Sequence, residues 1–132
     1  MFDKSQIIIS EEVEGHQLGT VTVNKVVNPT LALEAPIIPT ALTFSVTVLS
    51  SGGSYSDIET VEIIVEDADR KQIFSTGETS ISLPSQVTNI NFNVGIRNVL
   101  INNEGKYYAV AKFNGDKMIE HEFLINKVAS NN

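Results

Sequence analysis

The stretch Ala41-Leu42-Thr43-Phe44-Ser45-Val46-Thr47-Val48-Leu49 decides the fold class of this protein. Apolar side chains alternate along it with hydroxyl-bearing ones, which is the period-two pattern of a β-strand with one buried and one solvated face. Similar alternation recurs over residues 60–66 and 89–96, with valine, isoleucine and phenylalanine at the apolar positions. No convincing helical spacing extends over ten or more residues. We therefore expect an all-β protein.

Turn signals between the apolar runs divide the chain into short strands. Asn114-Gly115 predicts a type I′ hairpin, in which both turn residues have positive φ. Asp67-Ala68-Asp69-Arg70 predicts a polar turn, and three prolines predict an irregular crossover over residues 28–40. The further strands are expected at residues 6–10, 20–27, 72–75, 106–113 and 116–126, with a short one at 80–83.

These short strands, with turns between them, predict an antiparallel two-sheet, immunoglobulin-like β-sandwich of seven or eight strands. The chain of 132 residues fits one domain, which we expect over residues 1–128, followed by a disordered tail at 129–132. The expected core consists of the inward-facing positions of the strands: Leu42, Phe44, Val46, Val61, Ile63, Phe92, Val94, Tyr107, Phe123 and Ile125.

The run Asn103-Glu104-Gly105-Lys106-Tyr107 resembles the segment that enters strand F of immunoglobulin-like domains. In those domains the tyrosine hydroxyl bonds to the backbone a few residues upstream and forms a tyrosine corner. The resemblance implies that Tyr107 is a structural residue that holds this corner of the fold. Ala109 stands where an antibody domain has its second cysteine, so the disulfide version of the fold is excluded.

A wider resemblance covers about two-thirds of the chain and is densest in its last third. In the last third it rests on four segments: Asn93-Val94-Gly95-Ile96-Arg97-Asn98-Val99, Glu104-Gly105-Lys106-Tyr107, Phe113-Asn114-Gly115-Asp116 and Glu122-Phe123-Leu124-Ile125. Residues 39–69, a core strand followed by one that ends in an acidic turn, also fit. With these segments the chain resembles a family of small, uncharacterised bacterial β-sandwich proteins filed as a domain of unknown function. Residues 1–40 match that pattern poorly. The resemblance implies a fold and supplies no activity and no site residues.

Composition and charge exclude several classes of function. The chain has no cysteine, which removes disulfides, thiolate metal sites and cysteine nucleophiles. Its net charge of −7 argues against nucleic acid as a partner, because such binding depends on lysine and arginine contacts to phosphate. No apolar stretch reaches the length of a spanning helix, so no membrane is expected. We expect a cytoplasmic protein, or a mature fragment whose leader has been removed.

Acid–base or metal chemistry would depend on the two histidines. By strand parity His121 shares the core face of its strand, whereas Glu120 and Glu122 point the other way, so the three cannot converge on one ion. His16 follows a run of glutamates and is expected in a solvated loop. The acidic residues around Asp67 are interpreted as a polar hairpin rather than a calcium site. We expect no catalytic residue, metal or cofactor.

Asn89, Asn91 and Asn93 are the least ordinary feature, because asparagine is disfavoured in strands and these three share one outward face. We interpret them first as a solvated face that discourages edge-to-edge aggregation. The alternative is an amide surface that recognises sugars or another backbone. Tyr55, in a glycine- and serine-rich loop, is a candidate contact residue.

The sequence therefore favours a non-enzymatic interaction module with a protein partner, acting through loops or an exposed sheet edge. Two alternatives stay open. One is a structural or assembly component, bacterial or from a phage, that self-associates through sheet edges. The other is a carbohydrate-binding module.

Overall fold

The computed structural model describes residues 4–18, 21–51, 59–81 and 89–128, with side chains for all of these except 15–18, 21–24, 90 and 118. Within these ranges the chain is all-β and contains ten strands, against the seven or eight expected. The strands are β1 (Lys4–Leu18), β2 (Val21–Thr30), β3 (Ala32–Ala35), β4 (Thr40–Ser51), β5 (Thr60–Glu66), β6 (Gln72–Ser75), β7 (Thr79–Ser80), β8 (Asn89–Ile101), β9 (Gly105–Phe113) and β10 (Asp116–Lys127).

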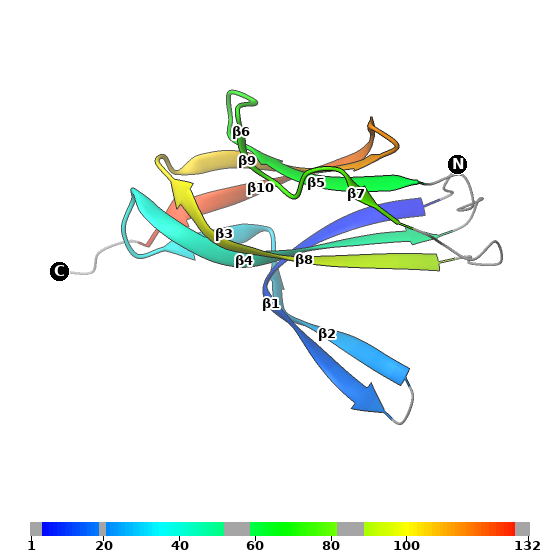
Figure 1. Ribbon diagram of the computed structural model, residues 1–132. Coiled ribbons are helices and arrows are strands. Elements are labelled where there is room, and N and C mark those ends of the chain that lie inside the picture. The colour runs from blue at the N-terminus through cyan, green and yellow to red at the C-terminus, as the bar shows by residue number, and fades with distance from the viewer. Residues whose placement is uncertain (1–3, 19–20, 52–58, 82–88, 129–132) are drawn as a thin grey trace.

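The strands form two sheets that face each other across one core (Figure 1). Sheet A has the order β2-β1-β4-β8, and sheet B has the order β3-β10-β9-β5-β6, with β7 also paired to β5. Aromatic contacts join the two layers: the ring centroids of Phe44 and Phe123 lie 5.9 Å apart, and those of Phe92 and Phe113 lie 6.0 Å apart. The arrangement is sandwich-like.

The expected core positions lie where the alternation places them. Seven of them are buried, and Leu42, Phe92 and Val94 are partly buried against the same cluster. The first half of β1 adds Ile7 and Ile9 to this core, and β3 adds Leu33. Period-two patterning is a strong guide here because one face of each sheet is buried against the core. Successive side chains along a strand point to opposite faces of the sheet, so every second residue faces the core.

The expectation of an irregular crossover over residues 28–40 is wrong for residues 28–30, which belong to β2, and for its middle part. Ala32–Ala35 forms β3, which runs parallel to β10 and pairs Leu33 with Ile125. The sheets are therefore not wholly antiparallel. Prolines flank the four-residue strand at positions 29 and 36 instead of interrupting it, and a short edge strand next to prolines is sterically acceptable.

The first two strands are longer than expected, and they form a hairpin. Residues 4–10 of β1 pair with β4, whereas residues 9–18 pair with β2 and leave the body of the sandwich. We call the projecting part, Glu11–Leu18 with Val21–Asn28, the arm; it points away from the outer face of sheet A (Figure 1). His16 therefore lies in a strand, opposite Val23, and not in the expected loop.

The local turn and corner predictions are confirmed. Asn114 and Gly115 have φ values of 52° and 82°, as a type I′ turn requires. The turn after β5 closes through the backbone bond from Arg70 N to Asp67 O at 2.9 Å. The Tyr107 hydroxyl donates to Asn103 O at 2.5 Å, which is the tyrosine-corner contact. The short strand expected at 80–83 occurs as Thr79–Ser80, and the tail at 129–132 lies outside the described residues.

Candidate functional site

The outer face of sheet A has a floor of small, uncharged polar groups. We call this the floor and define it by Ser10 of β1, Ser45 and Thr47 of β4, and Asn93 and Gly95 of β8. Strand register places Ser10, Ser45 and Gly95 in one row across the sheet. Ser10, Ser45 and Thr47 are buried although they are on the outward face. The Thr47 hydroxyl donates to Asn93 Oδ1 at 2.9 Å, which orients that amide.

The arm forms one wall beside this floor. Asn28 Nδ2 donates to Glu11 Oε2 at 2.8 Å and ties the two strands of the arm together where they leave the sheet. Asn28 has a φ of 54°, a left-handed conformation that asparagine tolerates better than most residues. The Ser10 hydroxyl donates to Glu12 O at 3.2 Å at the same place. These contacts hold the first carboxylates of the arm close to the sheet.

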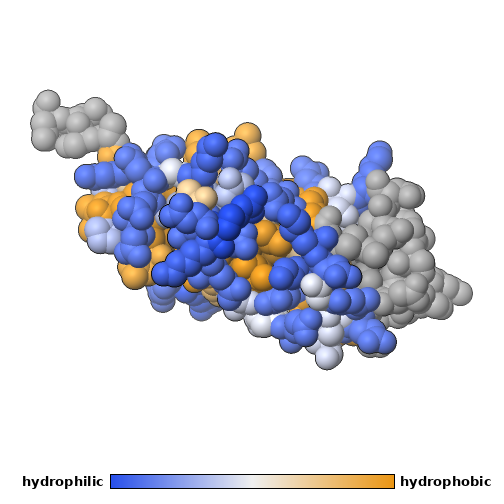
Figure 2. All heavy atoms as spheres, turned by 90° about the horizontal axis from the view of Figure 1, so that it is seen from above, coloured by the Kyte–Doolittle hydropathy of each residue, from blue (hydrophilic) through white to orange (hydrophobic). Residues whose placement is uncertain are grey.

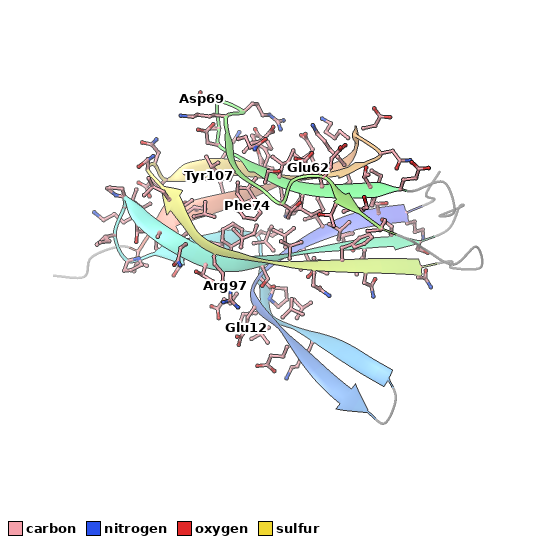
Figure 3. The ribbon with its side chains drawn as sticks, viewed as in Figure 1. Glu12, Glu62, Asp69, Phe74, Arg97 and Tyr107 are labelled. Carbon is pink, nitrogen blue, oxygen red and sulfur yellow. The ribbon has the colours of Figure 1, made fainter. Side chains whose placement is uncertain are left out.

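A recess of about 660 Å³ lies between the arm and sheet A. Glu11, Glu12 and Val13 line it from the arm, and Asn93, Arg97 and Asn98 line it from β8. Figure 3 shows Arg97 and Glu12 near the point where the arm leaves the sheet. Within the described part of the chain, neither of these two side chains has an ion-pair partner.

A bulge in β8 places Arg97 in this recess. The register with β4 shifts between Leu42 and Phe44, so that β8 has one residue more than β4 in this interval. Asn98 has a φ of 55°, and its backbone N–H donates to Thr43 Oγ1 at 3.1 Å. The extra residue lets Arg97 and Asn98 both lie exposed beside Thr43.

The asparagines predicted as a site do share the outer face of sheet A. Asn89, Asn91 and Asn93 are exposed on β8, opposite Ser51, Leu49 and Thr47 of β4. Asn93 borders the arm recess, whereas Asn89 and Asn91 border a second hollow of about 630 Å³ with Lys4 and Gln6. Tyr55 lies outside the described residues.

Sequence reasoning missed Arg97 and the carboxylates of the arm as site residues. The available signal for Arg97 was the break in alternation between Ile96 and Val99, which marks the bulge. The arm had no comparable signal, because its strands leave the sandwich and need no single apolar face.

The outer face of sheet B differs from the floor because it is charged and several of its charges are paired. Arg70 bonds to Glu120 at 2.9 Å and to Glu66 at 3.2 Å, and Lys117 bonds to Glu120 at 2.9 Å. The guanidinium carbon of Arg70 also lies 3.5 Å from the centroid of the Tyr108 ring. Figure 2, which looks onto this face, shows hydrophilic residues over much of it with apolar ones between.

The pairing moves two pKa values on this face. Hydrogen bonds from Arg70 and then Lys117 lower the pKa of Glu120 to about 2. The hydrogen bond to Glu120 raises the pKa of Arg70 above its ordinary value. This effect is larger than the lowering that partial desolvation causes. Both groups therefore stay charged under ordinary conditions and stabilise each other, which suits a structural contact between β10 and the turn after β5.

The acidic turn after β5 uses its carboxylates for its own backbone. Asp67 Oδ1 accepts bonds from the N–H groups of Asp69 and Lys71, both at 2.9 Å, while Glu66 is paired with Arg70. This is the polar hairpin that the sequence indicated. Among the described residues, no three histidine, aspartate or glutamate side chains are grouped as they would be around a metal ion.

His121 is half-buried on the core face of β10, as strand parity predicts, and lies opposite Ala109. Its Nε2 is buried without a hydrogen-bond partner. The side chain borders a shallow hollow of about 320 Å³ with residues 6–9 of β1 and Leu31. Glu120 and Glu122 lie on the other face of the strand, so the structure does not bring them to this imidazole.

No protein-family model matches this chain, and none of the curated proteins matches it. The resemblance to a bacterial family of unknown function therefore stays a prediction. Across the residues that the structure describes, no helix has the length and apolar character needed to cross a membrane.

Proposed function

We propose that the protein is a non-enzymatic interaction module that binds an extended segment of a partner protein in the recess between the arm and sheet A. The observation that carries this proposal is the composition of the recess. Its lining combines the hydroxyl and amide side chains of Thr43, Ser45, Asn93 and Asn98 with a guanidinium on β8 and two carboxylates on the arm.

The chemistry of these groups suits a polypeptide. Hydroxyl and amide side chains both donate and accept hydrogen bonds, as the backbone of an extended segment requires. Arg97 can take a carboxylate of the partner through two parallel N–H bonds, and Glu12 can take a lysine or arginine. Because neither side chain has an ion-pair partner among the described residues, binding does not first have to break an internal pair.

We also propose that the sandwich belongs to the immunoglobulin-like class. The bond from the Tyr107 hydroxyl to Asn103 O supports this assignment, because it reproduces the corner typical of those domains. The arm and the parallel strand β3 are additions to that pattern.

A carbohydrate is the second candidate ligand for the same face. The favouring observation is the row of exposed amides at Asn89, Asn91 and Asn93, the last of which is oriented by Thr47. Sugar hydroxyls pair well with such amides. A glycan array probed with the wild type and with N93A separates this candidate from a protein ligand.

The test of the main proposal is capture of partners from a lysate of the native cell by the tagged protein, followed by mass spectrometry. Four forms are compared: the wild type, R97E, E12K and the control K127E. Lys127 is exposed on β10 in the other sheet, so K127E reverses a charge without touching the recess.

We expect one stoichiometric, salt-sensitive partner on the wild type and on K127E, with capture by R97E and E12K reduced at least about tenfold. A partner that R97E retains at the wild-type level contradicts the proposal, as does recovery of the bait alone. Substrate turnover that disappears when His16 or His121 is replaced would contradict the non-enzymatic part.

A further inference from the structure

The edges of the two sheets are protected from unwanted strand pairing to very different degrees. On sheet B, β6 has four residues and follows directly on Arg70 and Lys71. The part of β10 that extends beyond β3 carries Lys117, Glu120 and a bulge between Lys117 and Ile119. β3 has four residues and is followed by a proline. Shortness, charge, bulges and proline are the devices by which edge strands avoid pairing with other chains.

The outer edge of sheet A is formed by β8, which lacks these devices over most of its length. β8 has 13 residues, and within the described part of the chain it pairs with β4 alone. Residues 89–96 contain no charged residue and no proline, and their register with β4 is regular. The bulge at Arg97-Asn98 comes only after this segment. In an antiparallel ladder alternate residues direct their N–H and C=O groups to each neighbour, so this segment has groups directed to the open side.

The inner face of this edge is incompletely covered. Phe92 and Val94 of β8 are only partly buried against the core. The residues directly opposite them on β4, Val48 and Val46, are 1% and 0% exposed. A further strand beside β8 would cover the apolar surface that Phe92 and Val94 still expose, and burial of such surface is favourable.

We propose that β8 pairs with β8 of a second copy of this chain, antiparallel and centred on Phe92, so that two sheets A become one continuous sheet. In this register Asn91 lies opposite the partner's Asn93, Asn89 lies opposite its Gly95, and the two Phe92 side chains meet on the inner face. Aromatic pairs across strands are stabilising, and an asparagine amide can both donate to and accept from another amide. The twofold symmetry makes the contact closed and self-complementary.

The self-complementary register favours a second copy as the occupant, and charge does not oppose it at this edge. The chain has a net charge of −7, so two copies repel each other over most of their surface. Residues 89–96, asparagines included, carry no charge. At this edge two acidic molecules can therefore approach without bringing like charges together. This proposal does not rest on the arm, because Arg97 lies beyond the paired segment.

The test is sedimentation equilibrium of the full chain over a wide range of concentrations. The wild type is expected to show a monomer–dimer equilibrium. N91K/N93K puts two pairs of like charges opposite each other and is expected to raise the dissociation constant at least about tenfold. N91K/N93E changes the same two exposed positions but pairs opposite charges, and it is expected to return the dissociation constant to within about threefold of the wild type.

Q72K/N126K is the charge control, because it adds two lysines at exposed positions of sheet B and is expected to leave the equilibrium unchanged. Circular dichroism melting checks that every variant remains folded. A wild type that stays monomeric overturns the proposal, as do equal dissociation constants for N91K/N93K and N91K/N93E or an equal effect of the control. R97E is expected to dimerise normally, so loss of partner capture and loss of dimerisation are separate results.

Discussion

At the scale of single residues, Tyr107 shows how one side chain holds a strand junction. It is 4% exposed, and its hydroxyl spans the connection between β8 and β9 to reach Asn103 O. Burial raises the pKa of this hydroxyl more than the bond to Asn103 lowers it, so the group keeps its proton and remains a donor.

Removing this hydroxyl is expected to cost stability without changing the fold. Y107F should lower the free energy of unfolding by about 0.5–1.5 kcal/mol, the net contribution of one hydrogen bond. Urea denaturation measures the loss. The control is Y108F, because the structure gives the Tyr108 hydroxyl no hydrogen-bond partner among the described residues. Equal losses in the two variants would show that the corner bond is not the cause.

At the scale of elements, Glu120 joins β10 to the turn after β5 through Arg70. Its pKa is lowered from 4.5 to about 2, so its contribution to stability is present above about 4.5 and is lost as the pH falls toward 2. E120Q lacks this titration and should lose less stability than the wild type on acidification.

The measurement is urea unfolding at about pH 6 and about pH 3 for the wild type, E120Q, R70Q and the double variant. Without Arg70, the carboxylate has lost its strongest partner, so E120Q should change the pH dependence less in the R70Q background than in the wild type. A change of the same size in both backgrounds would mean that the contact with Arg70 does not lower the pKa of Glu120.

Elements also differ in how far the sequence predicts them. The bounds of β4 and β5 could be predicted closely, because a strand with one buried face alternates apolar and polar residues along its length. The length of β1 could not, because the run Glu11–Gly15 has no apolar face and a strand solvated on both sides needs none. The edge position of β8 was equally hidden, since alternation shows which face is buried and says nothing about how many neighbours a strand has.

At the scale of the whole molecule, the arm contributes no described side chain to the core cluster of the sandwich. Of the residues whose side chains the structure describes, the core cluster takes Ile7 and Ile9 and then resumes at Leu33. Glu11 and Asn28 are bonded to each other at the base of the arm, so a two-residue type I′ turn can replace residues 12–27.

The chain shortened in this way, with Asn-Gly in place of residues 12–27, is expected to keep its free energy of unfolding to within about 1 kcal/mol. It should lose capture of the partner, because one wall of the recess is gone, and it should still dimerise through β8. Urea denaturation, lysate capture and sedimentation equilibrium check the three outcomes. A shortened chain that no longer folds would show that the arm stabilises the sandwich.

The acidic first half of the chain forms no separate body. Each sheet contains strands from both halves: β8 completes sheet A beside β1, β2 and β4, and β3 and β5 lie in sheet B with β9 and β10. Residues 1–69, with a net charge of −9, are therefore interleaved with residues 70–132, with a net charge of +2. The intermixing follows from the pairing of strands far apart in the sequence.

The sequence by itself determined the all-β class, the core faces, the Asn114-Gly115 turn and the contact made by Tyr107. Periodicity and turn chemistry are sufficient to predict the first three, and the resemblance of residues 103–107 to the strand F entry of immunoglobulin-like domains implied the fourth; each depends on side chains within a few residues of one another. Only the tertiary structure decided that the arm projects, that β3 runs parallel to β10, that Arg97 and Glu12 line one recess and that β8 has an open edge. The physical reason is that pairing partners and solvent exposure are set by segments far away in the chain, which local patterns do not record.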